Sequence, residues 1–234
     1  MFARCYACLL ALLVAACASY KPTAVPTVTM NDADFAFNDA GYGLNADPFV
    51  EISRQKSYFN ANFSEAGFLS VFVKVKNNGH EAISVRPYDI YLIFPDGSEL
   101  APVDSQVVAM SMEENGSITG SVLAFGIVGG LVATQAEEDA KKARIADYAS
   151  KQFKDTTLAP GASASGFVFY RVTSRVPGQT KLQARLLEVS TSQRSILEAP
   201  LGDVTTMLTV QQEEPQEATK PPPSGYPSSF GHGP

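Results

Sequence analysis

The chain has 234 residues and a formal net charge of −6, and no cluster of Lys or Arg interrupts this negative balance. Nucleic acid and anionic lipid head groups are therefore excluded as favoured partners, because both attract proteins through clustered positive charge. The length suits one large domain, or one domain with a substantial insertion.

Residues 1–16 have the pattern of a secretory signal peptide. One positive charge, at Arg4, precedes an apolar run from Leu9 to Val14, and two small residues follow. The run is too short to cross a bilayer comfortably, so we expect it to be removed rather than to stay as an anchor. Cys5 and Cys8 would leave with it, so the mature chain has no cysteine pair to oxidise.

The residues before the third cysteine resemble the lipobox of bacterial lipoproteins, with Val14-Ala15-Ala16 preceding Cys17. The resemblance implies that Cys17 becomes the mature N-terminus and carries a diacylglycerol thioether and an N-acyl chain. Each buried methylene contributes about 0.8 kcal/mol, so two or three chains make a firm anchor. In lipoproteins of bacteria with two membranes, an aspartate after the cysteine typically causes inner-membrane retention. Ala18 stands here, which implies the outer membrane, with the protein facing the periplasm.

Two other interpretations of this N-terminus remain open. One is an ordinary secretory peptide in which the cysteine occurs by chance. The other is an apolar N-terminus that is never cleaved. Neither would place a lipid on Cys17.

Residues 17–48 are predicted to be a lipidated tether and a lead-in rich in Asn, Asp and Gly. Pro22 and Pro26 lie among threonines, a composition that favours extended, solvated backbone up to about residue 30. Asp32 and Asp34 alternate as calcium ligands can. An EF-hand loop starting at Asp32 would need glycine at position 37 and glutamate at position 43, where the chain has phenylalanine and glycine. The calcium pattern therefore fails.

The residues from 49 to 210 are predicted to form one β domain. Period-two alternation indicates strands that bury one face. The predicted inward-facing residues are Leu69, Val71, Val73, Val75, Ile90, Leu92, Phe94, Leu182, Ala184 and Leu186. Asn78-Gly79 predicts a tight hairpin turn, and Pro95-Asp96-Gly97 predicts another. Short strands separated by turn signals are typical of a sandwich or a barrel.

Several turn motifs carry a family resemblance. They are Lys76-Asn77-Asn78-Gly79, Pro95-Asp96-Gly97, and Leu158-Ala159-Pro160-Gly161 leading into the strand at Gly166. Together they resemble immunoglobulin-like domains of bacterial envelope lipoproteins, over roughly residues 49–110 and 155–210. The resemblance implies a mainly β fold, an immunoglobulin-like β-sandwich, and it says little about function.

Between the two halves, at about residues 113–154, the strand pattern stops and a helical insertion is predicted. Its first part is nearly uncharged and Gly-rich, and pairs of glycines lie four apart at Gly116 and Gly120 and at Gly126 and Gly130. The second part, 136–153, has Glu and Lys at helical i, i+4 spacing, which predicts a helix. Small residues share one face of this helix: Ala133, Ala136, Ala140 and Ala143.

Three structures are compatible with the Gly-rich part. A helical hairpin would pack the glycine face on the alanine face or on a partner subunit, because glycines four apart let two backbones approach closely. The run is also near the minimum length that spans a bilayer, but the acidic residues at both of its ends argue against insertion. The third structure is an irregular insertion.

Catalytic motifs are not recognisable. The two histidines, His80 and His232, are far apart in the sequence, and no Gly-x-Ser-x-Gly elbow or dinucleotide fingerprint is present. We therefore expect no catalytic residue, no metal site and no cofactor beyond the acyl groups on Cys17. The tail, residues 211–234, is rich in Pro, Ser and Gly and is predicted to be disordered.

The sequence thus predicts a non-enzymatic lipoprotein of the outer membrane. It would act as a structural or assembly module that binds an envelope protein or itself through the Gly-rich hairpin, with Gly116, Gly120, Gly126, Gly130, Ala136, Ala140 and Ala143 as the interaction residues. The alternatives are a membrane-active protein whose hairpin enters a bilayer, and a sandwich that binds a ligand or inhibitor through its loops.

Overall fold

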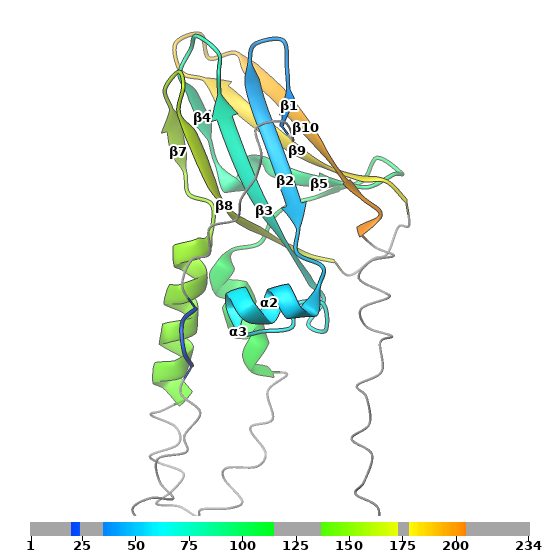
Figure 1. Ribbon diagram of the computed structural model, residues 1–234, viewed down its shortest axis with the longest axis vertical. Coiled ribbons are helices and arrows are strands. Elements are labelled where there is room, and N and C mark those ends of the chain that lie inside the picture. Colours follow the sequence, from blue (N-terminus) through cyan, green and yellow to red (C-terminus); the bar gives the residue numbers. More distant parts are fainter. Residues whose placement is uncertain (1–19, 24–34, 115–136, 173–177, 205–234) are drawn as a thin grey trace, which may run out of the picture.

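The computed structural model describes residues 20–23, 35–114, 137–172 and 178–204 (Figure 1). It is mainly β, with two antiparallel sheets packed face to face. The first sheet has the order β1-β2-β3-β8, with β1 (Ala36–Phe37), β2 (Tyr42–Pro48), β3 (Phe68–Asn77) and β8 (Ser163–Arg171). The second has the order β6-β5-β9-β4-β7, and β10 also pairs with β9. Its strands are β4 (Ile83–Val85), β5 (Ile90–Ile93), β6 (Glu99–Leu100), β7 (Thr156–Leu158), β9 (Thr180–Glu188) and β10 (Arg194–Gly202).

The core between the sheets contains the residues that the alternation predicts. Leu69, Val71, Val73 and Val75 of β3 are fully buried there. From the second sheet, the predicted residues of β5 and β9 join the same cluster, together with Phe94. The period-two prediction is therefore confirmed for these three strands, since successive side chains of a strand point to opposite faces.

The outer face of the first sheet is also buried at one end, where helices cover it. Phe68 and Phe72 of β3 and Phe167 and Phe169 of β8 lie under α2 (Ile52–Phe59), α3 (Ser105–Glu114) and the helix of residues 137–151. We call these three helices the helical base. A short 3-10 turn, η3 (Pro87–Asp89), precedes β5. Of the helix predicted over 136–153, residues 137–151 are helical in the structure, which confirms that prediction.

The loops at the other end of the sandwich are tied to one another. Asn78 N donates to Gly41 O at 2.9 Å, and Gly161 N donates to Asn77 O at 2.7 Å. Ser190 Oγ donates to Glu81 at 2.5 Å. We call these loops, residues 38–41, 77–82, 159–162 and 189–193, the sandwich tip. Figure 1 shows the tip and the helical base at opposite ends of the sandwich.

The tight hairpin predicted at Asn78-Gly79 is wrong. β3 belongs to the first sheet and β4 to the second, so this loop crosses between the sheets instead of joining paired neighbours. Gly79 is needed for another reason: a Cβ there would lie 2.5 Å from Ala40 O and 2.6 Å from the Tyr42 ring. The predicted turns at Gly97 and Gly161 are confirmed, and both glycines have φ of +82°.

The sandwich begins before the predicted boundary at residue 49. β2 lies inside the predicted lead-in and pairs with β3 along its whole length, from Tyr42 opposite Asn77 to Pro48 opposite Val71. Tyr42 and Leu44 enter the core between the sheets. This strand was not predicted because Gly43, Asn45 and Asp47, which are typical of loops, occupy its outward-facing positions.

Candidate functional site

The helical base has an aromatic core of its own, separate from the core between the sheets. Its buried members are Phe49, Phe59, Phe63, Phe68, Phe72, Val108, Ala109, Tyr148, Phe167 and Phe169. Phe59, the last residue of α2, is at its centre, with ring centroids 4.8 Å from those of Phe63 and Phe167. The contact with Phe167 is edge-to-face, and such ring contacts add to the free energy of area burial. The base is therefore fixed to the sheet by packing.

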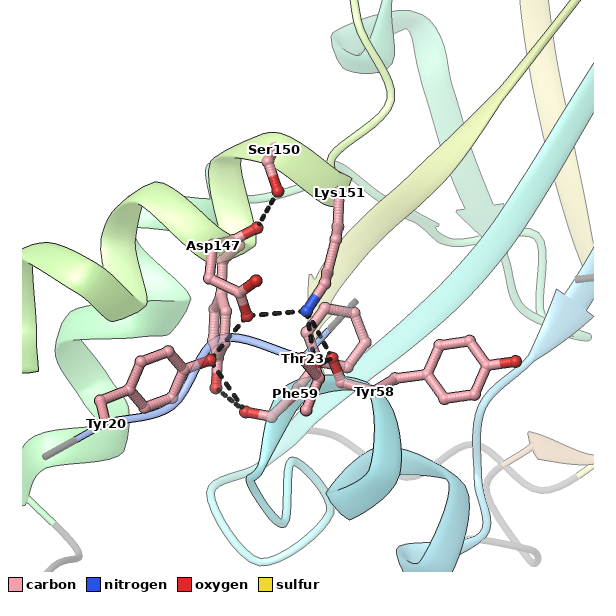
Figure 2. Close-up of polar contacts among 8 residues, drawn as sticks. Tyr20, Thr23, Tyr58, Phe59, Asp147, Ser150 and Lys151 are labelled. Atoms are coloured by element: carbon pink, nitrogen blue, oxygen red, sulfur yellow. Dashed lines mark hydrogen bonds and ion pairs between the residues drawn. The ribbon is translucent and has the colours of Figure 1, made fainter. Parts of the chain in front are cut away.

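Residues 20–23 lie against this base, and we call them the strap. The Tyr20 hydroxyl donates to Asp147 Oδ2 at 2.6 Å and lies 3.3 Å from Phe59 O. Thr23 Oγ1 donates to Tyr58 O and accepts a hydrogen bond from Lys151 Nζ at 2.8 Å (Figure 2). Tyr20 and Thr23 of the predicted solvated tether are thus docked on the protein, which differs from the expectation, whereas Lys21 and Pro22 between them are exposed.

The strap closes over an ion pair that is almost completely removed from solvent. Lys151 Nζ lies 2.7 Å from Asp147 Oδ2, and the two side chains are 0% and 4% exposed. The third proton of the ammonium goes to Tyr58 O at 2.6 Å. Asp147, Thr23 and Tyr58 therefore satisfy all three N–H groups of Lys151, as burial of an ammonium requires.

The position of the lysine also suits the end of α2. An α-helix leaves its last carbonyls without partners, and its C-terminus carries partial negative charge. Lys151 and Thr23 donate to Tyr58 O, and Tyr148 donates to Phe59 O at 3.2 Å. The helix of residues 137–151 and the strap together cap the end of α2.

Alkaline pH is expected to destabilise the chain, because buried tyrosines must lose protons. Burial raises the pKa of Tyr20, Tyr148 and Tyr170, and burial followed by the hydrogen bond to Glu188 raises that of Tyr42 to about 12. An unfolded tyrosine ionises near pH 10. Since these pKa values are raised in the folded state, the stabilisation is complete below pH 10 and is lost as pH rises, through about 12 for Tyr42.

Tyr42→Phe should lower the slope of unfolding free energy against pH between 10 and 12, by up to about 1.4 kcal/mol per pH unit. Urea titrations at several pH values measure this slope. Tyr88→Phe is the comparison: the charge of Asp104 and the hydrogen bond to it also raise the pKa of Tyr88, but its ring is largely exposed, so the slope should change less. An unchanged slope in Tyr42→Phe would contradict the assignment.

The predicted interaction residues fall mostly outside the described residues. Cys17, Gly116, Gly120, Gly126, Gly130 and Ala136 lie there. Ala140 and Ala143 are on the helix of residues 137–151, both partly buried and three residues apart, which places them on one side of it. Packing of the glycine face on the alanine face therefore stays a prediction. One predicted surface pair is present, with Lys142 Nζ 3.9 Å from Glu138.

The strap and its ion pair were not predicted. Asp147 and Lys151 have the same i, i+4 spacing as the surface pairs of this helix, so spacing alone could have indicated them. Nothing local indicates that this pair is buried, because Tyr20 is 127 residues away from Asp147 in the sequence. The only other indication of a docked strap in the sequence is Tyr20, an aromatic residue at the start of a segment rich in Pro and Thr.

Two kinds of feature are absent from the described parts of the chain. No group of three or more His, Cys, Asp or Glu side chains there is placed to hold a metal ion. Within the same ranges, no helix combines the length and the apolar character needed to cross a membrane.

Comparison with known proteins places the chain in no family. No family model matches it, and no curated protein matches it. Among solved structures, the yjhA protein from Bacillus subtilis aligns with 56% of this chain and 74% of its own, at 14% identity and a TM-score of 0.30. A likeness this weak carries no argument about function.

Proposed function

We propose that this chain is a lipid-anchored protein of the cell outer membrane, held by acyl groups on Cys17 and facing the periplasm. It acts as a non-enzymatic structural or assembly module of the envelope. The segment that contains Gly116, Gly120, Gly126 and Gly130 binds a partner protein or a second copy.

One observation carries this proposal. Described parts of the chain begin or end at residues 20, 114 and 137, and these three ends all lie at the helical base (Figure 1). Cys17 is three residues before Tyr20, and the Gly-rich segment joins residues 114 and 137. The proposed anchor and the proposed interaction segment are therefore attached to the same end of the protein, away from the sandwich tip.

Strand order supports an immunoglobulin-like identity for the sandwich. The constant-type fold pairs strands A, B and E in one sheet and C, F and G in the other. Here β2-β3-β8 and β5-β9-β10 have that order along the chain, and β10 lies beside β2 where the two sheets meet. Two helices of the base, α3 and the helix of residues 137–151, lie between β6 and β7, which corresponds to the connection between the C and E strands, whereas α2 lies between β2 and β3.

The same placement keeps bilayer insertion as a second candidate function. An anchor at Cys17 would bring residues 114 and 137 close to the lipid, so a segment between them could enter the bilayer. Glu138 and Lys142 lie near one end of this segment, and both side chains are 73% exposed. Charged, solvated side chains at this position favour contact with a protein partner in water over insertion into acyl chains.

Cys17→Ser should move the protein from the membrane fraction to the soluble fraction. Without the thioether no lipid can be added, and the exposed Glu137, Glu138 and Asp139 of the base are repelled by anionic lipid. Sedimentation of envelopes, followed by mass measurement of the N-terminal peptide of the wild type, checks both parts. Cys5→Ser is the control, since that residue lies in the signal peptide. If the Cys17→Ser protein still sediments and resists alkaline extraction, insertion replaces anchoring as the leading function.

A further inference from the structure

We propose that the helical base is the bilayer-facing surface of the anchored protein, and that the docked strap enforces this orientation. The inference rests on the lipid anchor of the proposed function. Three residues of fully extended chain span at most about 11 Å, so an anchor at Cys17 cannot lie farther than that from the backbone of Tyr20. Because the Tyr20 hydroxyl is bonded to Asp147, the membrane surface must lie close to the helix of residues 137–151.

The strap is held to the helix of residues 137–151 at both of its ends. Tyr20 bonds Asp147, about one turn before the end of the described helix, and Thr23 bonds Lys151 at its end. In addition, Arg144 lies over the Tyr20 ring, 5.3 Å from its centroid. If the strap left, Lys151 would lose one of its three acceptors and Asp147 would lose a donor. Both charges would then need water at a site that is now dry, which opposes release.

The strap also has a direction. It runs parallel to the helix, from Asp147 at Tyr20 to Lys151 at Thr23 (Figure 2). Its residue-20 end is therefore the end nearer to residue 137, which lies away from the sheets in Figure 1. β3 runs from the base toward the tip and is about 30 Å long at 3.3 Å per residue. A lipid attached before Tyr20 thus places the tip far from the bilayer, where it is open to other envelope components.

Charge does not produce this orientation by itself. The exposed residues at the start of the described helix are Glu137, Glu138 and Asp139, which anionic lipid repels. Lys142, which is also exposed, lies within 4.0 Å of Glu138 and Asp139. The exposed charges at this end of the helix therefore do not attract such a bilayer, and a protein with a free tether would tumble about its anchor. The strap is what distinguishes a fixed orientation from tumbling.

The test places a fluorophore on the lipidated full chain in phosphatidylethanolamine and phosphatidylglycerol vesicles that contain a nitroxide-labelled phospholipid. Separate variants carry it at Glu138→Cys, in the base, and at His80→Cys, in the tip; both side chains are exposed. We expect several-fold stronger quenching at position 138 than at position 80. Equal quenching, or stronger quenching at position 80, would overturn the orientation while leaving the anchor intact.

The role of the strap is tested by Tyr20→Phe with Thr23→Val, a mild change that removes its hydroxyls. In this variant the ratio of quenching at position 138 to quenching at position 80 should fall toward one, and Lys151 should become reactive to an amine acylating reagent. The soluble Cys17→Ser chain gives the same acylation comparison without any lipid. An undiminished quenching difference overturns the strap's role, as does a Lys151 already reactive in the Cys17→Ser chain. A wild type that is not attached through Cys17 overturns the proposed function and this orientation together.

Discussion

Replacing Asp147 with alanine should lower the free energy of unfolding by about 3–5 kcal/mol, the range for removal of one partner of a buried ion pair. The Lys151 ammonium would stay buried with only Thr23 and Tyr58 as acceptors, and the Tyr20 hydroxyl would lose the nearer of its two acceptors. Urea unfolding of the soluble Cys17→Ser chain, followed by circular dichroism, measures the loss. Much of it comes from the uncompensated charge rather than from the value of the pair itself.

The same helix supplies a matched control. Glu138 and Lys142 have the same i, i+4 spacing as Asp147 and Lys151, but both side chains are 73% exposed. Glu138→Ala should therefore cost only about 0.5 kcal/mol or less. Asp147→Leu combined with Lys151→Met should recover part of the loss, because no charge then remains buried. An Asp147→Ala variant that loses no more than Glu138→Ala would show that the pair is solvated.

The strands could be predicted because their signal is local. In β3 the alternation of Leu69, Val71, Val73 and Val75 reports one buried face, whatever the rest of the chain does. The opposite face could not be predicted so well. The alternation places Ser70 on that face, yet Ser70 is fully buried, between Phe68 and Phe72 under the helical base. Burial of a second face depends on helices that arrive from distant parts of the sequence.

Pairing between elements was less predictable than the elements themselves. Asn78-Gly79 is a strong local hairpin signal, yet the chain there crosses from one sheet to the other. A turn motif fixes the bend of the backbone and leaves open which strand receives the next one. β2 was missed for a related reason, since Asn45 and Asp47 suggest a loop until their place on an outer face is known.

The candidate site was the least predictable part. Its four polar side chains come from residues 20–23 and 147–151, and each has an ordinary solvated interpretation in its own segment. Burial of Lys151 follows only when α2, the helix of residues 137–151 and the strap meet. The Gly-rich segment, in contrast, was conspicuous in the sequence, and its role stays a prediction that needs experiment.

Replacing residues 116–134 with a Gly and Ser linker of equal length should abolish binding to envelope partners and self-association, while membrane attachment is unchanged. α3 and the helix of residues 137–151 are left intact, because Val108 and Tyr148 are buried in the aromatic core and their loss would unfold the base. Crosslinking in envelopes, through a cysteine at Ser121 in the parent chain and at the matching linker position, measures the association. Unfolding free energy should stay within about 0.5 kcal/mol of the parent.

Two point variants separate close backbone approach from general apolar contact. Gly120→Val and Gly126→Val add bulk where glycines four apart would let two backbones meet, so crosslinking should fall several-fold. Val122→Ala removes apolar surface in the same segment without adding bulk and should have the smaller effect. If instead the linker variant keeps every crosslinked partner, the segment is not the interaction surface. Assembly would then have to be sought at the sandwich tip, which the strap would hold farthest from the membrane.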